Sequence, residues 1–349
     1  MLSQSRRHRQ SDQRRIPRGS GHNLLDLAGH RGYRGGTAER RKGYGPKVKN
    51  PLIKAYVAWA LVCFFWGTTY LAIRIGVATF PPALFAGTRF TVAGLAFLAF
   101  LKLRGYRLPP WREAVDQAVV GIALLAIANG TVVWCEQWVP SGITALIIAT
   151  VPFWMSGFDA LMPAGDRLTP RKVLGIVIGF AGLVLLLWPD LKSDLAPSYL
   201  RAVLILLIAP LSWAAGSMYS RYRRTTTHPL MAAAIQTLVA GLVLMLTGIA
   251  AGEFDGLNVT APSLAAMAYL IVFGSIVGYS CYIYALGALP VTFVSTFAYI
   301  NPLIAVLLGW LILDERLDFY VVAATAIILS GVLLVQTAAA ATGSEKIRG

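Results

Sequence analysis

The sequence has few charged residues. Asp, Glu, Lys and Arg together make up 13% of the 349 residues, whereas soluble domains carry about 25%. The deficit is deepest after Lys54, where apolar runs follow one another, each close to the roughly 20 residues needed to cross a bilayer. A water-soluble core has no use for so many helix-length apolar runs. The composition therefore predicts an all-α integral membrane protein.

Cysteine and histidine are also scarce, and their placement excludes the common metal and disulfide patterns. Cys63, Cys135 and Cys281 lie inside apolar runs or at their ends, and their spacing matches no metal site. Their odd number argues against a disulfide framework, so we interpret them as small apolar side chains. The four histidines lie outside the apolar runs. We therefore expect neither a metal ion nor a cofactor.

The sequence lacks the motifs of membrane-embedded and ATP-driven catalysis. It contains no HExxH, no GxSxG, no GxxxxGK[ST] and no paired aspartates inside an apolar run. We therefore expect no catalytic residues and no enzymatic activity, with an embedded enzyme kept as an alternative. A channel is a second alternative, although no ring of like charges and no filter-like loop is visible.

Acidic residues are about half as frequent as basic ones, with 16 against 31, which gives a net charge of +15. Basic runs often bind phosphate. Here, however, the basic residues lie in the N-terminal tail and in alternate loops, so we expect no nucleic-acid partner. Residues 1–54 are predicted to form a basic tail, and three interpretations stay open. It is a disordered cytoplasmic segment, an organellar transit peptide or the product of a start codon assigned too early.

The apolar runs between charged or Pro/Gly breaks predict ten membrane-spanning helices. Their expected ranges are 55–78, 82–101, 115–136, 142–162, 172–188, 199–220, 229–251, 264–286, 291–313 and 319–338. Basic loop residues cluster at 102–112, 167–172 and 221–224, and acidic residues occupy the intervening loops. Basic loops stay on the cytoplasmic side. Both termini are therefore predicted to be cytoplasmic, including the short C-terminal tail at 339–349.

The chain contains an internal repeat. A shift of about 147–150 positions pairs Trp66 with Trp213 and Arg74 with Arg221. Further pairs are Pro82 with Pro229, Gly94 with Gly241, Pro140 with Pro290, Pro152 with Pro302, and Gly182 with Gly331. Each repeat holds five spans, and an odd number forces the second copy into the membrane upside down. The sequence thus predicts two inverted repeats, 55–188 and 199–338. This arrangement is typical of secondary transporters, whose substrate site lies between the repeats.

Several stretches resemble a known family. They are FFWGTTYLAIRIGVATFPP (64–82), PSGITALIIATVPFW (140–154) and AYINPLIAVLLGWLILDERL (298–317). Together they resemble the drug/metabolite transporter superfamily, and within it the EamA-type transporters of the inner membrane. The resemblance implies ten helices, two repeats, cytoplasmic termini and transport of small metabolites, often outward. One departure is Asp166, where this family usually has Glu.

Polar side chains inside the apolar runs are the candidates for a substrate cavity, because polar groups in lipid are costly and usually face the bundle interior. In the span at 291–313, the polar residues recur at helical spacing on one face. The candidates are Trp66, Thr69 and Tyr70 in the first span, Asn129 in the third, Tyr279 and Tyr282 in the eighth, and Thr296, Tyr299 and Asn301 in the ninth. For each of them, packing or hydrogen bonding between helices is an equally good interpretation.

Two charged residues are sharper candidates. Arg89 lies about two turns into the second span, where a guanidinium could attract an anionic substrate group. The alternative is that its side chain extends back to the outer interface. Glu136 is the best-placed carboxylate for proton coupling, because burial can change how readily a carboxylate takes up a proton. Its position at the end of the third span favours ordinary solvation as the alternative.

The function predicted from these features is secondary transport by alternating access. The expected partners are the lipid bilayer and a small-molecule substrate, such as an amino acid, a sugar-like or a drug-like solute. Transport is driven either by the solute gradient or by protons, and export is favoured over import. The expected location is the inner or plasma membrane.

Overall fold

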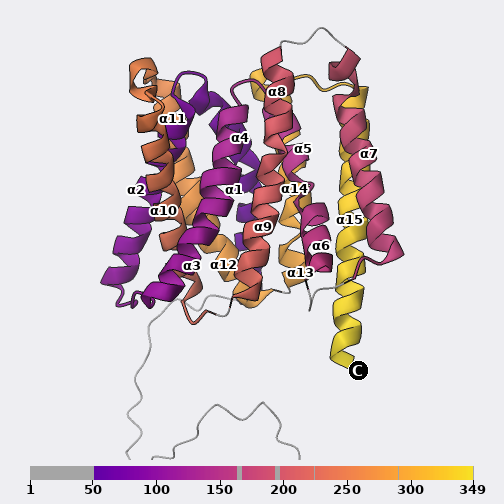
Figure 1. Ribbon diagram of the computed structural model, residues 1–349, viewed down its shortest axis with the longest axis horizontal. Helices are drawn as coiled ribbons and strands as arrows, with labels where there is room; N and C mark the ends of the chain where they lie inside the picture. The colour runs from indigo at the N-terminus through magenta and orange to yellow at the C-terminus, as the bar shows by residue number, and fades with distance from the viewer. Residues whose placement is uncertain (1–50, 163–166, 193–196, 224, 290, 349) are drawn as a thin grey trace, which may run out of the picture. The chain divides into compact units, whose positions relative to one another are not determined.

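The computed structural model describes residues 51–162, 167–192, 197–223, 225–289 and 291–348. All regular elements in these ranges are helices, and Figure 1 shows them running side by side. The all-α prediction is confirmed. The basic tail predicted before residue 51, and Asp166, lie outside the described residues.

The first half of the chain forms five spans, two of which are built from more than one helical piece. Its elements are α1 (Pro51–Val77), α2 (Pro82–Leu103), α3 (Trp111–Gly121), the π-helical segment η1 (Ile122–Asn129), α4 (Gly130–Cys135), α5 (Ser141–Ile148), α6 (Val151–Leu161) and α7 (Pro170–Lys192). The run from α3 to α4 forms the third span, and α5 with α6 forms the fourth.

The second half repeats this plan. Its elements are α8 (Pro197–Leu206), α9 (Ile208–Tyr222), α10 (Pro229–Ala250), the short 3₁₀ helix η2 (Glu253–Gly256), α11 (Ala261–Tyr269), the π-helical segment η3 (Leu270–Val277), α12 (Gly278–Ala288), α13 (Val291–Val294), α14 (Phe297–Leu313) and α15 (Phe319–Arg348).

The ten predicted spans are recovered, with shifts at their ends and one division. Among the described residues, nine helical stretches are long and apolar enough to cross a membrane, and α14 is a shorter apolar helix. The expected span 291–313 is divided into α13 and α14. In addition, α1 begins at Pro51 instead of 55, and α15 continues to Arg348 instead of ending at 338. A helix need not end where its apolar run ends, because water can satisfy its exposed backbone.

Irregular backbone recurs at equivalent places in the two halves. The π-helical segments η1 and η3 are offset by 148 positions, within the predicted repeat spacing. The helix also breaks at Thr150 in the fourth span and at Thr296 in the ninth. At both breaks the threonine hydroxyl donates to the carbonyl three residues earlier, at 2.6 Å, which competes with regular helical bonding. The internal repeat is therefore visible in the backbone itself.

The two repeats are inverted. Thr79, just after α1, shares a hydrogen bond with Thr260, just before α11 (3.0 Å between the hydroxyl oxygens). The end of α1 and the start of α11 therefore lie at one face, which we call the acidic face. The equivalent helix, α9, ends beside the end of α6, where Tyr222 donates to Asp159 (2.9 Å). We call that second face the basic face. The loop before α10 lies there, because Thr227 donates to Glu113 at the start of α3. The other end of α10 lies at the acidic face, where Glu253 accepts from Leu84 at the start of α2. The first helices of the two repeats therefore point in opposite directions.

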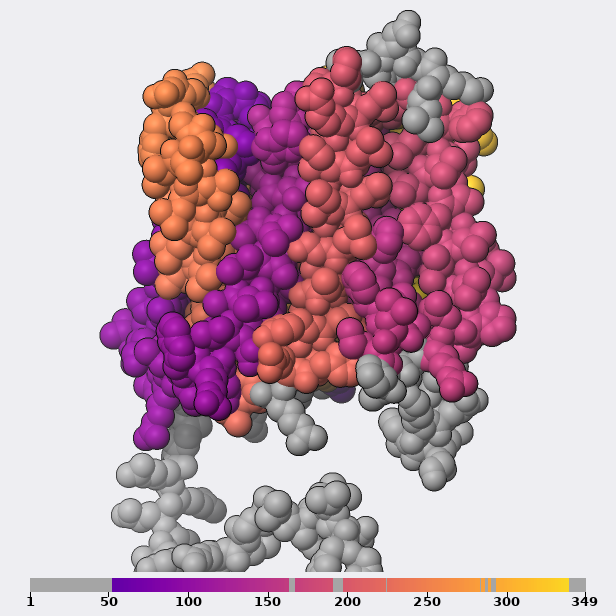
Figure 2. All heavy atoms as spheres, in the orientation of Figure 1, coloured from indigo at the N-terminus to yellow at the C-terminus, as the bar shows by residue number. Residues whose placement is uncertain are grey.

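Close helix packing joins equivalent helices of the two repeats, with α2 beside α10 and α7 beside α15 (Figure 1). In the space-filling view of Figure 2, α7 covers all but a few atoms of α15. A Cβ atom on Gly94 would lie 2.6 Å from the backbone of Leu238 in α10. A Cβ on Gly331 would lie 2.5 Å from the carbonyl oxygen of Gly175. Small residues allow this close approach of two helix backbones.

Candidate functional site

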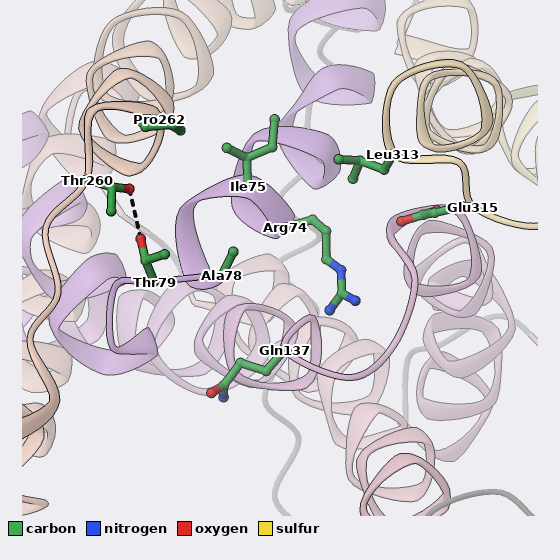
Figure 3. Close-up of a pocket in the computed structure, with 9 residues that line it drawn as sticks. All are labelled: Arg74, Ile75, Ala78, Thr79, Gln137, Thr260, Pro262, Leu313 and Glu315. Atoms are coloured by element: carbon green, nitrogen blue, oxygen red, sulfur yellow. Dashed lines mark hydrogen bonds between the residues drawn. The ribbon is translucent and has the colours of Figure 1, made fainter.

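A pocket lies at the acidic face, between helix ends that belong to both repeats (Figure 3). Its volume is about 750 Å³, within the range of roughly 300–1,000 Å³ that holds small molecules. The lining residues are Arg74, Ile75, Ala78, Thr79, Gln137, Thr260, Pro262, Leu313 and Glu315. The pocket thus offers a cation, a carboxylate, an amide and two hydroxyls on an otherwise apolar wall.

Arg74 connects the pocket to the protein interior. Its guanidinium reaches into the space between Glu315 and Gln137 (Figure 3). The Nη1 atom donates to the backbone carbonyl of Glu136. Arg74 is therefore part of the pocket wall and has a defined hydrogen-bond partner. The sequence did not predict this role, because it shows only how far Arg74 lies from the end of its span.

Glu315 closes the opposite wall and holds the start of a helix in the other repeat. Its carboxylate accepts from the backbone N–H groups of Ser141 (2.6 Å) and Gly142 (3.0 Å) at the start of α5. The first N–H groups of a helix have no partner within the helix, and an anion there also meets the favourable end of the helix dipole. The sequence gives one indication of this contact: α5 begins after Pro140 and has no acidic residue in its first turn to accept from its own N–H groups.

Glu136 is completely buried, with 0% of the residue exposed, so the solvated alternative is wrong. Neither carboxylate oxygen has a hydrogen-bond partner among the described residues. The carboxylate interacts electrostatically with Arg74, Arg89 and Glu315.

Arg89 is also buried, with 5% of the residue exposed, so its side chain does not extend to the interface. Its Nε and Nη1 atoms lack a hydrogen-bond partner among the described residues. The guanidinium lies over the ring of Phe90, 4.7 Å from its centre. Its Nη2 atom lies 3.2 Å from where a Cβ on Gly274 would be. Leaving a buried charge unpaired costs about 3–5 kcal/mol, so this site requires explanation.

Several predicted cavity residues form one aromatic cluster around α1 and α12. The ring of Trp66 lies 5.2 Å from that of Tyr282, and Tyr282 lies 6.1 Å from Tyr279. The indole N–H of Trp66 donates to the carbonyl of Gly274 (3.2 Å). Because Arg89 also lies against Gly274, the structure brings Arg89 and the Trp66 cluster to the same part of η3.

Other predicted residues are occupied by local bonds. The hydroxyls of Thr69 and Thr296 donate to carbonyls three residues earlier in the chain. Tyr299 donates to Gln336 in α15 (2.6 Å). With its amide nitrogen turned toward the neighbouring carbonyl oxygens, Asn301 donates to the carbonyl of Cys63 (3.0 Å). For these four residues the packing interpretation fits the structure better than a ligand-binding one.

Two predicted residues, Asn129 and Tyr70, lie in different surroundings. The side-chain oxygen of Asn129 is buried without a hydrogen-bond partner among the described residues, at the end of the π-helical η1. Tyr70, one turn before Arg74 on α1, interacts electrostatically with Glu136. Tyr70 therefore belongs with the buried charged residues, whereas nothing in the structure connects Asn129 to them.

The two repeats are also tied together at the basic face. Glu113 at the start of α3 accepts from the backbone N–H groups and hydroxyls of the segment Thr225–Thr227, at 2.6–3.0 Å. Asp159 pairs with Arg221 (3.4 Å) and accepts from Tyr222. These carboxylates therefore join the first repeat to the end of α9 and the loop after it.

The described ranges contain no group of three or more His, Cys, Asp or Glu placed to hold a metal ion. The fold and pocket instead define a class of protein. Two inverted five-helix repeats that cross a membrane, with a polar pocket between them, form the architecture of a membrane transporter.

The comparison with known proteins agrees. The EamA-like transporter family matches residues 53–188 and again residues 200–337, and the chain belongs to this family. The family match falls on the two repeats predicted from the sequence, which confirms the resemblance seen there.

Two related bacterial proteins are named as uncharacterized transporters. The chain is 41% identical to the inner membrane transporter YedA of Escherichia coli (strain K12), over 82% of this chain and 90% of YedA. It is 24% identical to the transporter YvbV of Bacillus subtilis (strain 168), over 84% of this chain and 93% of YvbV. A solved crystal structure with 25% identity aligns with a TM-score of 0.57, over 81% of this chain and 98% of that one.

Proposed function

We propose that this membrane transporter moves a small polar metabolite across the cytoplasmic membrane by alternating access. The pocket between the repeats is the observation that carries the proposal. It lies at the acidic face and combines an apolar wall with Arg74, Gln137 and Glu315. An amino acid, a sugar-like or a drug-like solute would fit its size and chemistry. The solute leaves chemically unchanged.

Cross-repeat contacts at both faces support alternating access. The acidic face has the bond between Thr79 and Thr260 and the contact of Glu315 with α5. The basic face has the contact of Glu113 with the segment before α10. In this mechanism the repeats rock against each other, so contacts at one face break while those at the other form.

The direction we propose is outward, with both termini in the cytoplasm. The basic face carries Lys102, Arg104 and Arg107 in one loop, and basic loops remain cytoplasmic. The pocket at the acidic face then opens toward the outside. Export is the direction that the family resemblance implies most often.

Glu136 is our candidate for proton coupling. It is a buried carboxylate next in sequence to Gln137 of the pocket lining, and its oxygens have no hydrogen-bond partner among the described residues. Arg74 connects the residue to the pocket wall through its backbone carbonyl. A rocking motion that changes the distances to Arg74 and Arg89 would change its affinity for a proton.

Flux into proteoliposomes tests transport directly. We expect at least one solute from a metabolite panel to cross unmodified, faster than in liposomes without protein. Ser330→Ala should transport like the unsubstituted protein, because this exposed hydroxyl donates only to a carbonyl of its own helix. Recovery of a chemically altered product alone would instead support an embedded enzyme. Flux that never saturates with solute concentration would support a channel.

A disulfide between the repeats tests alternating access. The hydroxyl oxygens of Thr79 and Thr260 are 3.0 Å apart, so cysteines at both positions should form a bond upon oxidation. We expect oxidation of this double variant to reduce flux at least about tenfold and a reductant to restore it, because the repeats can no longer separate. The control is each single variant, in a background where Cys63, Cys135 and Cys281 are replaced by Ala. Full flux through the oxidised double variant would rule out the rocking motion.

A further inference from the structure

A smaller pocket lies at the basic face, between the end of α2 and the start of α10. Its volume is about 340 Å³, and its lining residues are Phe100, Leu101, Arg104, Tyr106 and Leu230. The lining is apolar or aromatic except for the guanidinium of Arg104 and the hydroxyl of Tyr106. A wall of this composition suits a molecule that is partly apolar and partly anionic.

The chain that walls this pocket is held by a regular helix C-cap. The N–H of Gly105 donates to the carbonyl of Lys102 at 3.0 Å. The N–H of Tyr106 donates to the carbonyl of Leu101, also at 3.0 Å. With Gly105 at a φ of 82°, these two bonds form the Schellman motif that ends many helices. The ring of Tyr106 lies 4.8 Å from that of His228, just before α10. The pocket therefore has a defined wall that joins the two repeats.

Arg104 has no carboxylate partner in the part of the chain that the structure describes. Its guanidinium lies over the ring of Phe100, 5.1 Å from the ring centre. The next carboxylates along the chain are engaged elsewhere, because Glu113 binds the segment Thr225–Thr227 and Asp116 binds the end of α9. Residues 102–112 contain three further basic residues and no acidic one. The charge that the pocket offers to a ligand is therefore positive.

The start of α10 adds to this positive potential. Leu230, the second residue of the helix, lines the pocket. The first turn of α10 contains no acidic residue, so the positive end of the helix dipole is not neutralised there. An anion beside the start of a helix is stabilised by this dipole. The helix start and Arg104 thus favour the same kind of ligand, although they belong to different repeats.

The surroundings of the pocket match the position of a lipid headgroup. The apolar span of α2 ends at Leu103, so Arg104 is the first residue beyond it. Phe100 lines the pocket and is still 49% exposed, and Leu103 is 88% exposed. Leu95, Ala99 and Leu103 are exposed at a spacing of four residues, which places them on one face of the helix. This apolar strip leads from the pocket along the span, as an acyl chain would.

We propose that this pocket binds an anionic phospholipid of the leaflet at the basic face. The phosphate accepts from the guanidinium of Arg104 and the hydroxyl of Tyr106, and an acyl chain lies along the exposed strip of α2. Basic pockets between membrane helices bind anionic headgroups in this way. The lipid contacts α2 and α10 together, so it stabilises the contact between the repeats. The site lies at the face opposite the transport pocket and is distinct from it.

Titration of the purified full-length protein in detergent tests the lipid site. The ligands are dioleoylphosphatidylglycerol, dioleoylphosphatidylcholine and glycerol phosphate, which is the soluble part of the anionic headgroup. Native mass spectrometry measures bound lipid, and the thermal unfolding midpoint measures stabilisation. We expect the anionic lipid to bind at least about fivefold more tightly than phosphatidylcholine, because choline brings a positive charge to a basic surface. Glycerol phosphate should leave the midpoint unchanged, because it lacks the acyl chains.

Variants assign the binding to this pocket. Arg104→Gln should weaken binding of phosphatidylglycerol about tenfold, the loss expected for a hydrogen bond to a charged group. Arg107→Gln is the matched control, because it removes the same charge from the same exposed loop but Arg107 does not line the pocket. Solvent screens a charge without direct contact, so the control should change binding less than about twofold. Leu230→Trp adds bulk to the pocket without changing charge and should also weaken binding.

Each contrary outcome has a definite meaning. Equal binding of the two lipids, or equal losses for Arg104→Gln and Arg107→Gln, would show only diffuse attraction and would overturn the site. Stabilisation by glycerol phosphate as large as that by the lipid would identify a site for a soluble anion instead. If a pocket variant fails to fold, the comparison of the three ligands on the natural protein still decides. Measurements of solute flux do not enter this test, so its result is independent of the proposed transport function.

Discussion

At the scale of single residues, carboxylates hold helices of the other repeat. Glu253, after α10, accepts from the backbone N–H groups of Ala83 (3.2 Å) and Leu84 (2.8 Å) at the start of α2. Glu315 does the same for α5. Both helices begin at a proline or directly after one and have no side-chain cap of their own. In each case a carboxylate of the second repeat accepts from the first N–H groups of a helix in the first repeat. The same hydrogen bonds therefore stabilise the helix start and join the two repeats.

Replacement of Glu253 should therefore destabilise the protein. We expect Glu253→Ala to lower the free energy of unfolding by about 1–2 kcal/mol, the usual cost of a lost helix cap. The measurement is the thermal unfolding midpoint in detergent. The matched control is Asp255→Ala, two residues away on an exposed part of the same loop, which should leave the midpoint unchanged. Equal midpoints for both variants would show that the cross-repeat cap contributes nothing.

At the scale of helices, pairs of equivalent elements pack through glycine. Helix α7 meets α15 where Gly175 and Gly179 face Gly331, backbone against backbone. Without a hydrophobic effect inside lipid, helix association depends on such close packing. The same principle operates between α2 and α10 at Gly94. The third and eighth spans differ from these helices, because each contains a π-helical segment. Segments of that kind are frequent at functional sites.

A methyl group at the seam tests this packing. A Cβ on Gly331 would lie 2.5–2.8 Å from backbone atoms of α7, so we expect Gly331→Ala to cost about 1–3 kcal/mol through overpacking. The control is Gly157→Ala in α6, where no atom lies within 4 Å of the added Cβ. Because Ala favours helix more than Gly, this control should be neutral or gain up to about 1 kcal/mol. Unfolding midpoints of the two variants give the comparison, and a Gly331→Ala protein as stable as the control would contradict the seam.

At the scale of the whole molecule, the inverted repeat separates charge between two faces. Loops rich in Lys and Arg lie at one face, and those with Glu253 and Glu315 lie at the other. This asymmetry arises because an odd number of spans places equivalent loops of the two repeats on opposite sides. The same inversion puts the pocket at one face while carboxylates of the first repeat hold the end of α9 at the other.

Cysteine labelling in cells measures which face is outside. Leu257 at the acidic face and Leu108 at the basic face are both exposed, at 39% and 55%. In a background without native cysteines, we expect a membrane-impermeant maleimide to label Leu257→Cys in intact cells. Leu108→Cys should react only after permeabilisation, because basic loops stay in the cytoplasm. Labelling of Leu108→Cys alone in intact cells would reverse the orientation and the direction of the pocket. Labelling of both would contradict the inverted arrangement.

The sequence by itself determined the membrane location, the ten spans, the repeat and the family. Each of these depends on local composition or on a periodicity along the chain, such as the spacing that pairs Trp66 with Trp213. A helix-length apolar run crosses the bilayer as a helix, because its backbone groups must bond to one another there. This outcome does not depend on which helices become neighbours.

Only the tertiary structure decided which polar side chains remain available to a ligand. Thr69, Thr296, Tyr299 and Asn301 fit a cavity pattern along the chain, yet each bonds to its own helix or to a neighbouring one. Glu315 appeared in the sequence as an ordinary loop acid, and its partners come from the other repeat, more than 170 positions away. The availability of a hydrogen bond is a property of neighbours in space, and folding brings those neighbours from distant parts of the chain.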